Sequence, residues 1–175
     1  MKPFSLVNAF LAAALAAVAG CGPFWLNPYV EVEESKLNRV EIHYYKLDKK
    51  PIHRTAVYID GSGYVILKKG TSELISNDFA KRNSSEGWED IKTQHVHVNP
   101  SHVKDIFQNL VNHGLLDSEK NFKGTKKPRK DRYLGVMARI NGQAYIEQAN
   151  IFEADPELAE VLLDVVREFD NPTLR

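Results

Sequence analysis

Two hydrophobic periodicities divide the chain into strands and helices. Residues 39–47 alternate, with Val40 and Ile42 on one side and Glu41 and His43 on the other. A period of two in a stretch rich in β-branched and aromatic residues predicts a half-buried strand. Residues 93–98 show a shorter stretch of the same kind.

Glycine-containing turns predict two hairpins. Two β-rich runs, residues 55–59 and 64–68, flank Asp60-Gly61-Ser62-Gly63. Glycine supplies the positive φ that tight loops require, so these runs should pair antiparallel. Between this hairpin and the short strand, the polar residues 71–90 predict a long loop held down by three apolar side chains, Leu74, Ile75 and Phe79.

The second hairpin covers residues 133–149 and turns at Asn141-Gly142, the strongest short-range signal for a two-residue hairpin loop. A strict two-residue loop pairs Ala138 with Tyr145 and Val136 with Glu147, so the apolar faces match imperfectly. A bulge or a longer loop is the alternative.

A period of 3.6 predicts a helix over residues 99–114. Asn99 can cap it, Pro100 suits its first position, and Gly114 can end it in the left-handed conformation. Leu115 should then contact Leu110 across a Schellman ending. The apolar positions of this helix are Val103, Ile106, Phe107, Leu110 and Val111.

A last helix begins at Asp155-Pro156 and directs Leu158, Val161, Leu162, Val165 and Phe169 inward. The order is therefore strands, helix, strands and helix, joined by hairpin turns rather than by parallel crossovers. This order predicts an α+β domain, an antiparallel sheet with two main helices packed on one face.

The N-terminus has the order of an export signal. Lys2 precedes an uncharged, mostly apolar run over residues 4–20 that is short for a membrane span. Val18-Ala19-Gly20-Cys21 ends this run and resembles the lipobox of bacterial lipoproteins. The resemblance implies signal cleavage before Cys21, a diacylglyceryl thioether on its sulfur and acylation, typically with palmitate, of the new amino group.

Two lipid chains or more hold a protein firmly to a bilayer. Cys21 is the only cysteine, which excludes disulfide, iron–sulfur and thiolate–zinc chemistry within one chain. The alternatives are a soluble signal peptide that leaves Cys21 as a free thiol, or a buried N-terminal helix of a cytosolic domain. Gly22, where an aspartate would resemble an inner-membrane retention signal, favours the outer membrane of a Gram-negative envelope.

The expected organisation is a signal peptide over residues 1–20, a lipidated tether over 21–38 and one α+β domain over 39–175. Removing residues 1–20 leaves 22 basic and 23 acidic residues. This balance exerts no global attraction on nucleic acid, which export also disfavours as a partner.

Three histidines are the weak candidates for a metal site. His95 and His97 lie on the same side of a predicted strand, and His102 follows in the helix. Imidazole is a good zinc ligand, but His-x-His alone is a weak signal and no carboxylate has a recognisable ligand spacing. Surface histidines at a strand-to-helix junction are the alternative, and the expectation is no metal, no other cofactor and no catalytic residue.

Ser62 lies in Gly-Ser-Gly, between two strands rather than at a nucleophile elbow, so turn chemistry accounts for it. A basic segment follows the first helix and can contact anionic headgroups or an acidic partner, or serve only as a solvated connection. Its cations are Lys120, Lys123, Lys126, Lys127, Arg129, Lys130 and Arg132.

The resulting hypothesis is a cell-envelope lipoprotein held to the membrane through lipidated Cys21, with a non-catalytic domain that binds another molecule, such as an envelope protein. The alternatives are a histidine-metal-dependent hydrolase and an inhibitor or immunity-type lipoprotein.

Overall fold

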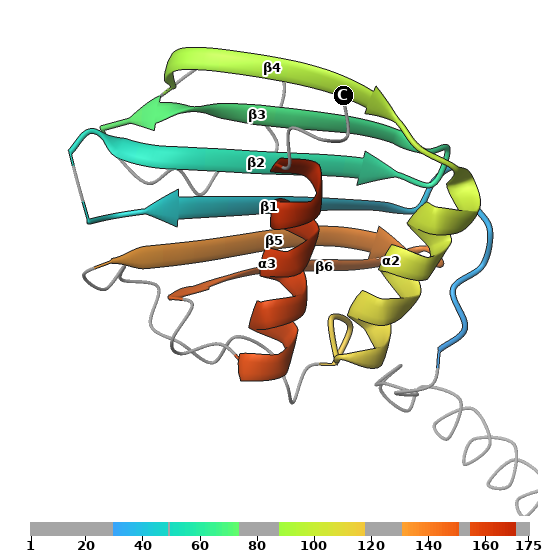
Figure 1. The fold of residues 1–175 in the computed structure, drawn as a ribbon. Helices are drawn as coiled ribbons and strands as arrows, with labels where there is room; N and C mark the ends of the chain where they lie inside the picture. Colours follow the sequence, from blue (N-terminus) through green and yellow to red (C-terminus); the bar gives the residue numbers. More distant parts are fainter. Residues whose placement is uncertain (1–29, 49, 74–87, 118–130, 151–154, 171–175) are drawn as a thin grey trace, which may run out of the picture.

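The computed structural model describes residues 30–48, 50–73, 88–117, 131–150 and 155–170. Within these ranges, six strands form one antiparallel sheet in the order β4-β3-β2-β1-β5-β6, and two helices lie on one of its faces (Figure 1). This arrangement confirms the expected α+β class. The elements are β1 (Arg39–Lys46), β2 (Ile52–Asp60), β3 (Tyr64–Ser72), β4 (Glu89–His97), α2 (Pro100–Asn112), β5 (Arg132–Ile140), β6 (Gln143–Asn150) and α3 (Pro156–Asp170).

Both hairpins have the predicted pairing. In β2–β3, Ile59 lies opposite Val65. In β5–β6, Ala138 lies opposite Tyr145, as a strict two-residue loop requires. Asn141 and Gly142 have φ values of +50° and +79°. Positive φ at both central residues is the type I′ geometry that matches the twist of paired strands, so neither a bulge nor a longer loop is present here.

The ends of α2 follow from its sequence. The Asn99 side chain accepts a hydrogen bond from the Ser101 backbone N–H at 3.0 Å. At the other end Gly114 adopts a φ of +92°. The Gly114 N–H donates to the Val111 carbonyl and the Leu115 N–H to the Leu110 carbonyl, the two bonds of a Schellman motif.

The start of α3 also follows from its sequence. The side chain of Asp155 caps α3 by accepting hydrogen bonds from the backbone N–H groups of Glu157 and Leu158.

The hydrophobic core lies between the sheet and the helices. Alternate residues of the central strands face the two helices, as a period of two demands. The sheet residues in this core are Val40, Ile42, Val57, Ile59, Val65, Leu67, Leu134, Val136, Ala138 and Ile140.

Two parts of the chain differ from the expectation. β3 and β4 are longer than the predicted runs and occupy both ends of the expected loop, because Lys69 and Thr71 pair with Lys92 and Glu89 around an irregularity in the register. These paired residues are all polar, so the hydrophobic pattern did not predict that they belong to strands. The three apolar residues expected to hold down that loop, Leu74, Ile75 and Phe79, lie outside the described residues.

The N-terminal boundary of the folded body also moves. Residues 30–38, assigned above to the tether, lie against the domain, and Val32 is fully buried in the core. We call residues 30–38 the strap. Within the described ranges, no helix combines the length and the apolarity needed to cross a membrane.

Candidate functional site

Side-chain amides hold the strap to the domain. Gln108 on α2 accepts a hydrogen bond from the Val32 N–H at 2.8 Å and donates to the Val30 carbonyl at 3.0 Å. Asn141, in the β5–β6 turn, accepts from the Glu33 N–H at 2.9 Å and donates to the Glu31 carbonyl at 2.7 Å. These paired bonds satisfy backbone groups that have no strand partner.

Asn38 closes this network. Its side chain donates to the Glu33 carbonyl at 2.8 Å and accepts from the Asn141 backbone N–H at 2.9 Å. Asn38 is 2% exposed. A buried amide with partners on both sides fixes the path of the strap, because each lost bond would leave a polar group unsatisfied.

The turn between β2 and β3 contacts the strap through the backbone of Gly61, which has no side chain. The Gly61 N–H donates to the Asn38 carbonyl at 2.8 Å, and a Cβ at Gly61 would lie 2.0 Å from the Ser35 carbonyl oxygen. Gly63 has a φ of +90°, and a Cβ there would lie 2.1 Å from the Val98 carbonyl oxygen. Both glycines are therefore required by close approach, and Gly63 also by its conformation.

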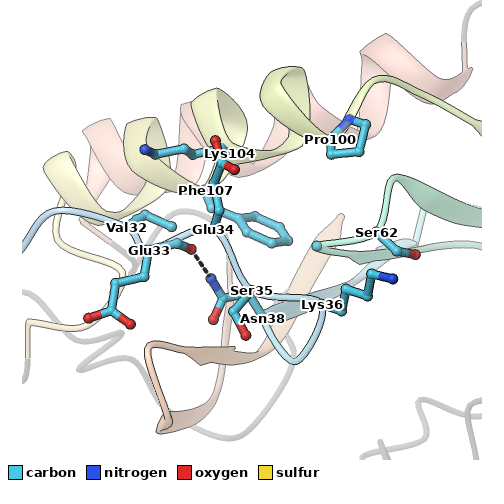
Figure 2. Close-up of a pocket in the computed structure, with 11 residues that line it drawn as sticks. Val32, Glu33, Glu34, Ser35, Lys36, Asn38, Ser62, Pro100, Lys104 and Phe107 are labelled. Carbon is cyan, nitrogen blue, oxygen red and sulfur yellow. Dashed lines mark hydrogen bonds between the residues drawn. The ribbon is translucent and has the colours of Figure 1, made fainter.

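A pocket of about 260 Å³ lies between the strap, this turn and the start of α2. Figure 2 shows the ring of Phe107 facing into it, with Pro100 above and Ser62 at one side. Phe107, Pro100 and Val32 supply an apolar floor. The charged residues around its rim are Glu33, Glu34, Lys36 and Lys104.

A hydroxyl–carboxylate pair beside this pocket, Ser62 and Asp60, stabilises the turn. Ser62 Oγ donates to Asp60 Oδ1, and the same oxygen accepts from the backbone N–H groups of Ser62 and Tyr64. Among the described residues that line the pocket, none is a histidine. This geometry matches the turn role predicted for Ser62 and provides no activated nucleophile.

The structure does not bring the three candidate histidines together. His95 and His97 lie on β4 on the face away from the helices, where the Tyr64 hydroxyl lies 2.7 Å from His95 Nδ1. His102 lies on α2 and is 2.6 Å from Glu168 of α3, on the opposite side of the sheet. No group of three or more His, Cys, Asp or Glu side chains suited to a metal occurs within the described ranges.

Most of the residues expected to contact the membrane lie outside the part of the chain that the structure describes. Cys21 and six of the seven basic residues, Lys120, Lys123, Lys126, Lys127, Arg129 and Lys130, lie outside the described residues. Arg132 is described and is exposed at the start of β5. It lies at the opposite end of β5 from Asn141 and the strap.

The face of the sheet opposite α2 and α3 carries a buried charged cluster that the sequence did not predict. The alternation of β1 placed Glu41 and His43 on a solvent-facing side, and this was wrong: they are 2% and 3% exposed. Arg54 of β2 is 3% exposed beside them. The alternation of β1 shows that Val40 and Ile42 share one buried face. It does not show whether the opposite face, with Glu41 and His43, is exposed or covered.

Hydrogen bonds link Glu41, His43 and Arg54 in a row. His43 Nε2 lies 2.7 Å from Glu41 Oε1, and His43 Nδ1 lies 2.9 Å from Arg54 Nη2. A guanidinium can only donate, so Nδ1 must accept, and the single ring proton must lie on Nε2 and be donated to Glu41. The imidazole is therefore neutral and bridges a carboxylate and a cation.

Burial lowers the pKa of His43 below its ordinary value, against the opposing effect of Glu41, and Arg54 and Lys68 lower it further. Burial also lowers the pKa values of Arg54 and Lys68. Two aromatic rings pack on the Arg54 guanidinium. Its central carbon, Cζ, lies 5.0 Å from the centroid of the Tyr45 ring and 4.0 Å from the centroid of the Trp88 ring.

No protein-family model matches the chain, and no curated protein matches it.

Proposed function

We propose that this protein is a lipid-anchored lipoprotein of the bacterial envelope, outer membrane rather than inner, whose domain binds a partner without catalysing a reaction. The pocket beside the strap carries the binding part of this proposal. It combines an apolar floor with a charged rim, the arrangement that typically orients a ligand in a protein site.

The size of the pocket favours a protein partner. Pockets for whole small molecules occupy roughly 300–1,000 Å³, and this one has about 260 Å³. Such a volume suits a single apolar side chain flanked by charges. Interfaces concentrate binding energy in buried anchors of this kind, surrounded by a polar rim. We therefore expect an envelope protein that inserts an aromatic or aliphatic side chain against Phe107.

The position of the pocket links binding to anchoring. One of its walls is the strap, and only eight residues lie between Cys21 and Val30. Fully extended, such a segment spans at most about 30 Å. A partner at this pocket would therefore be held close to the bilayer surface.

Anchoring is tested with a Cys21→Ser variant expressed in a Gram-negative host. We expect the wild type to incorporate a palmitate analogue and remain with the membranes, and the variant to do neither. Equal labelling of both proteins would contradict the lipid anchor, and Ala19→Ser, which keeps the thiol, serves as the control for the signal region.

Binding is tested by photo-crosslinking in intact cells with benzoylphenylalanine in place of Lys36, at the pocket rim, or of Lys92, exposed on β4. We expect one partner to be captured from Lys36 and not from Lys92. Adding Lys104→Glu, which reverses a rim charge, should reduce that capture. The same products from both positions, unaffected by Lys104→Glu, would refute the pocket as the binding site.

A further inference from the structure

The buried cluster opposite the helices forms a contact between three strands that depends on one neutral imidazole. Glu41 and His43 belong to β1, Arg54 belongs to β2, and Trp88 immediately precedes the edge strand β4. The hydrogen bond from Arg54 to His43 holds the guanidinium where it packs on the Trp88 ring. A guanidinium over an indole face at this distance is attractive, and more so when it is shielded from water.

Three polar atoms of the cluster have no hydrogen-bond partner among the described residues: Glu41 Oε2, Arg54 Nε and Arg54 Nη1. Buried polar groups are normally paired, so few contacts within the described residues fix the position of this guanidinium. Arg54 therefore depends on the bond to His43 and on its aromatic neighbours to remain in place.

We propose that His43 is an acid-sensitive lock, which holds Arg54 under Trp88 while the imidazole is neutral and releases Trp88 and the start of β4 when it is protonated. Protonation places a hydrogen on Nδ1, which then faces the Arg54 donor at 2.9 Å. Two donors cannot bond, and the buried site gains a second like charge beside Arg54.

The charged groups that face His43 determine whether a substitution makes the imidazole easier or harder to protonate. Glu41 lies beside it on β1, Arg54 on β2 and Lys68 on β3, with Tyr45 stacked on the imidazole and Tyr133 of β5 against Tyr45. Glu41 favours the protonated ring, whereas Arg54 and Lys68 disfavour it. Gly135 is the β5 residue paired with His43, and it adds no charge.

The test uses the full chain in detergent with Trp25→Phe, which leaves Trp88 as the single tryptophan. Trp88 emission and far-ultraviolet circular dichroism are recorded from pH 8 to pH 4.5. We expect a one-proton change in Trp88 emission with a midpoint below 6.5, at constant helix and strand content. His43→Gln, whose amide can donate to Glu41 and accept from Arg54 while remaining neutral, should abolish the change.

Two further variants should move the midpoint in opposite directions. Glu41→Gln should lower it, because the favourable charge is lost, and Lys68→Gln should raise it, because an unfavourable charge is lost. His102→Gln, which removes an exposed histidine, is the matched control and should leave the midpoint unchanged.

Constant emission over this range in the wild type, the same change in His43→Gln, or a change that coincides with loss of secondary structure would overturn the lock. If His43→Gln fails to fold, the opposite shifts of the Glu41 and Lys68 variants decide between the outcomes, and equal midpoints would count against the proposal.

Discussion

Replacing Gly61 by alanine should detach the strap from the domain. The added Cβ would lie 2.0 Å from the Ser35 carbonyl oxygen, and real contacts essentially never fall below 3.0 Å, so one of the two backbones must move by about 1 Å. That movement strains two linked hydrogen bonds: Asn38 N–H to the Ser35 carbonyl at 3.1 Å, and Gly61 N–H to the Asn38 carbonyl at 2.8 Å.

Each weakened bond costs about 1 kcal/mol and the overpacking about 1–3 kcal/mol, while the stiffer unfolded chain returns about 0.5 kcal/mol. We expect a net loss of about 2.5–4.5 kcal/mol in the free energy of unfolding. For a domain of this size, that corresponds to a fall in melting temperature of roughly 10 °C.

Thermal unfolding followed by circular dichroism measures the loss, and hydrogen exchange at the Val32 amide locates it. Gly142→Ala is the control, because its Cβ meets nothing within 4 Å although its φ is +79°. That variant should lose only about 1 kcal/mol, from the left-handed conformation, and leave the Val32 amide protected. If Gly61→Ala stays within about 0.5 kcal/mol of wild type with Val32 equally protected, the steric argument is refuted.

Three other outcomes are expected. Asn141→Gly keeps the positive φ but deletes two bonds to the strap, so stability should fall by about 1–2 kcal/mol and exchange at the Glu33 amide should accelerate. Gly114→Ala should cost about 1 kcal/mol in urea unfolding, because its φ of +92° ends α2. Since the pKa of folded His43 is lowered, its contribution to stability is complete above about pH 6.5 and is lost as the pH falls through the folded pKa. Urea unfolding from pH 8 to pH 5 should show a slope of up to about 1.4 kcal/mol per pH unit that His43→Gln removes.

The elements that local sequence could predict are those that local chemistry determines. The Asn99 cap, the Gly114 ending and the Asn141-Gly142 turn each depend on residues within six positions of one another, and each has the predicted geometry. The fold class followed from the order of such elements. The pairing of Lys69 and Thr71 with β4 could not be predicted in the same way, because those residues carry no apolar pattern.

The strap could not be predicted because its contacts are remote in sequence. Gln108 lies 76 and 78 positions from its two partners in the strap, and Asn141 lies 103–110 positions from its own. An asparagine before glycine is already explained by the turn it forms, so nothing in the pattern indicates its second task. The same holds for Gly61, where turn chemistry concealed a requirement for close approach to Ser35.

The buried cluster was missed for a different reason, and that reason bears on what the cluster does. In an alternating strand, polar side chains such as Glu41 and His43 are usually exposed to solvent. A fold selected only for stability gains little by burying both of them beside Arg54. Apolar side chains at these three positions would fill the space without the three polar atoms that find no partner among the described residues. Stability alone therefore does not favour the cluster, whereas the proposed lock uses its buried imidazole, held between Glu41 and Arg54. A triple replacement by apolar residues of similar volume would separate these requirements: the domain should be at least as stable as the wild type at pH 7 and should lose its response to acid, and a strongly destabilised triple variant would show instead that the cluster serves the fold.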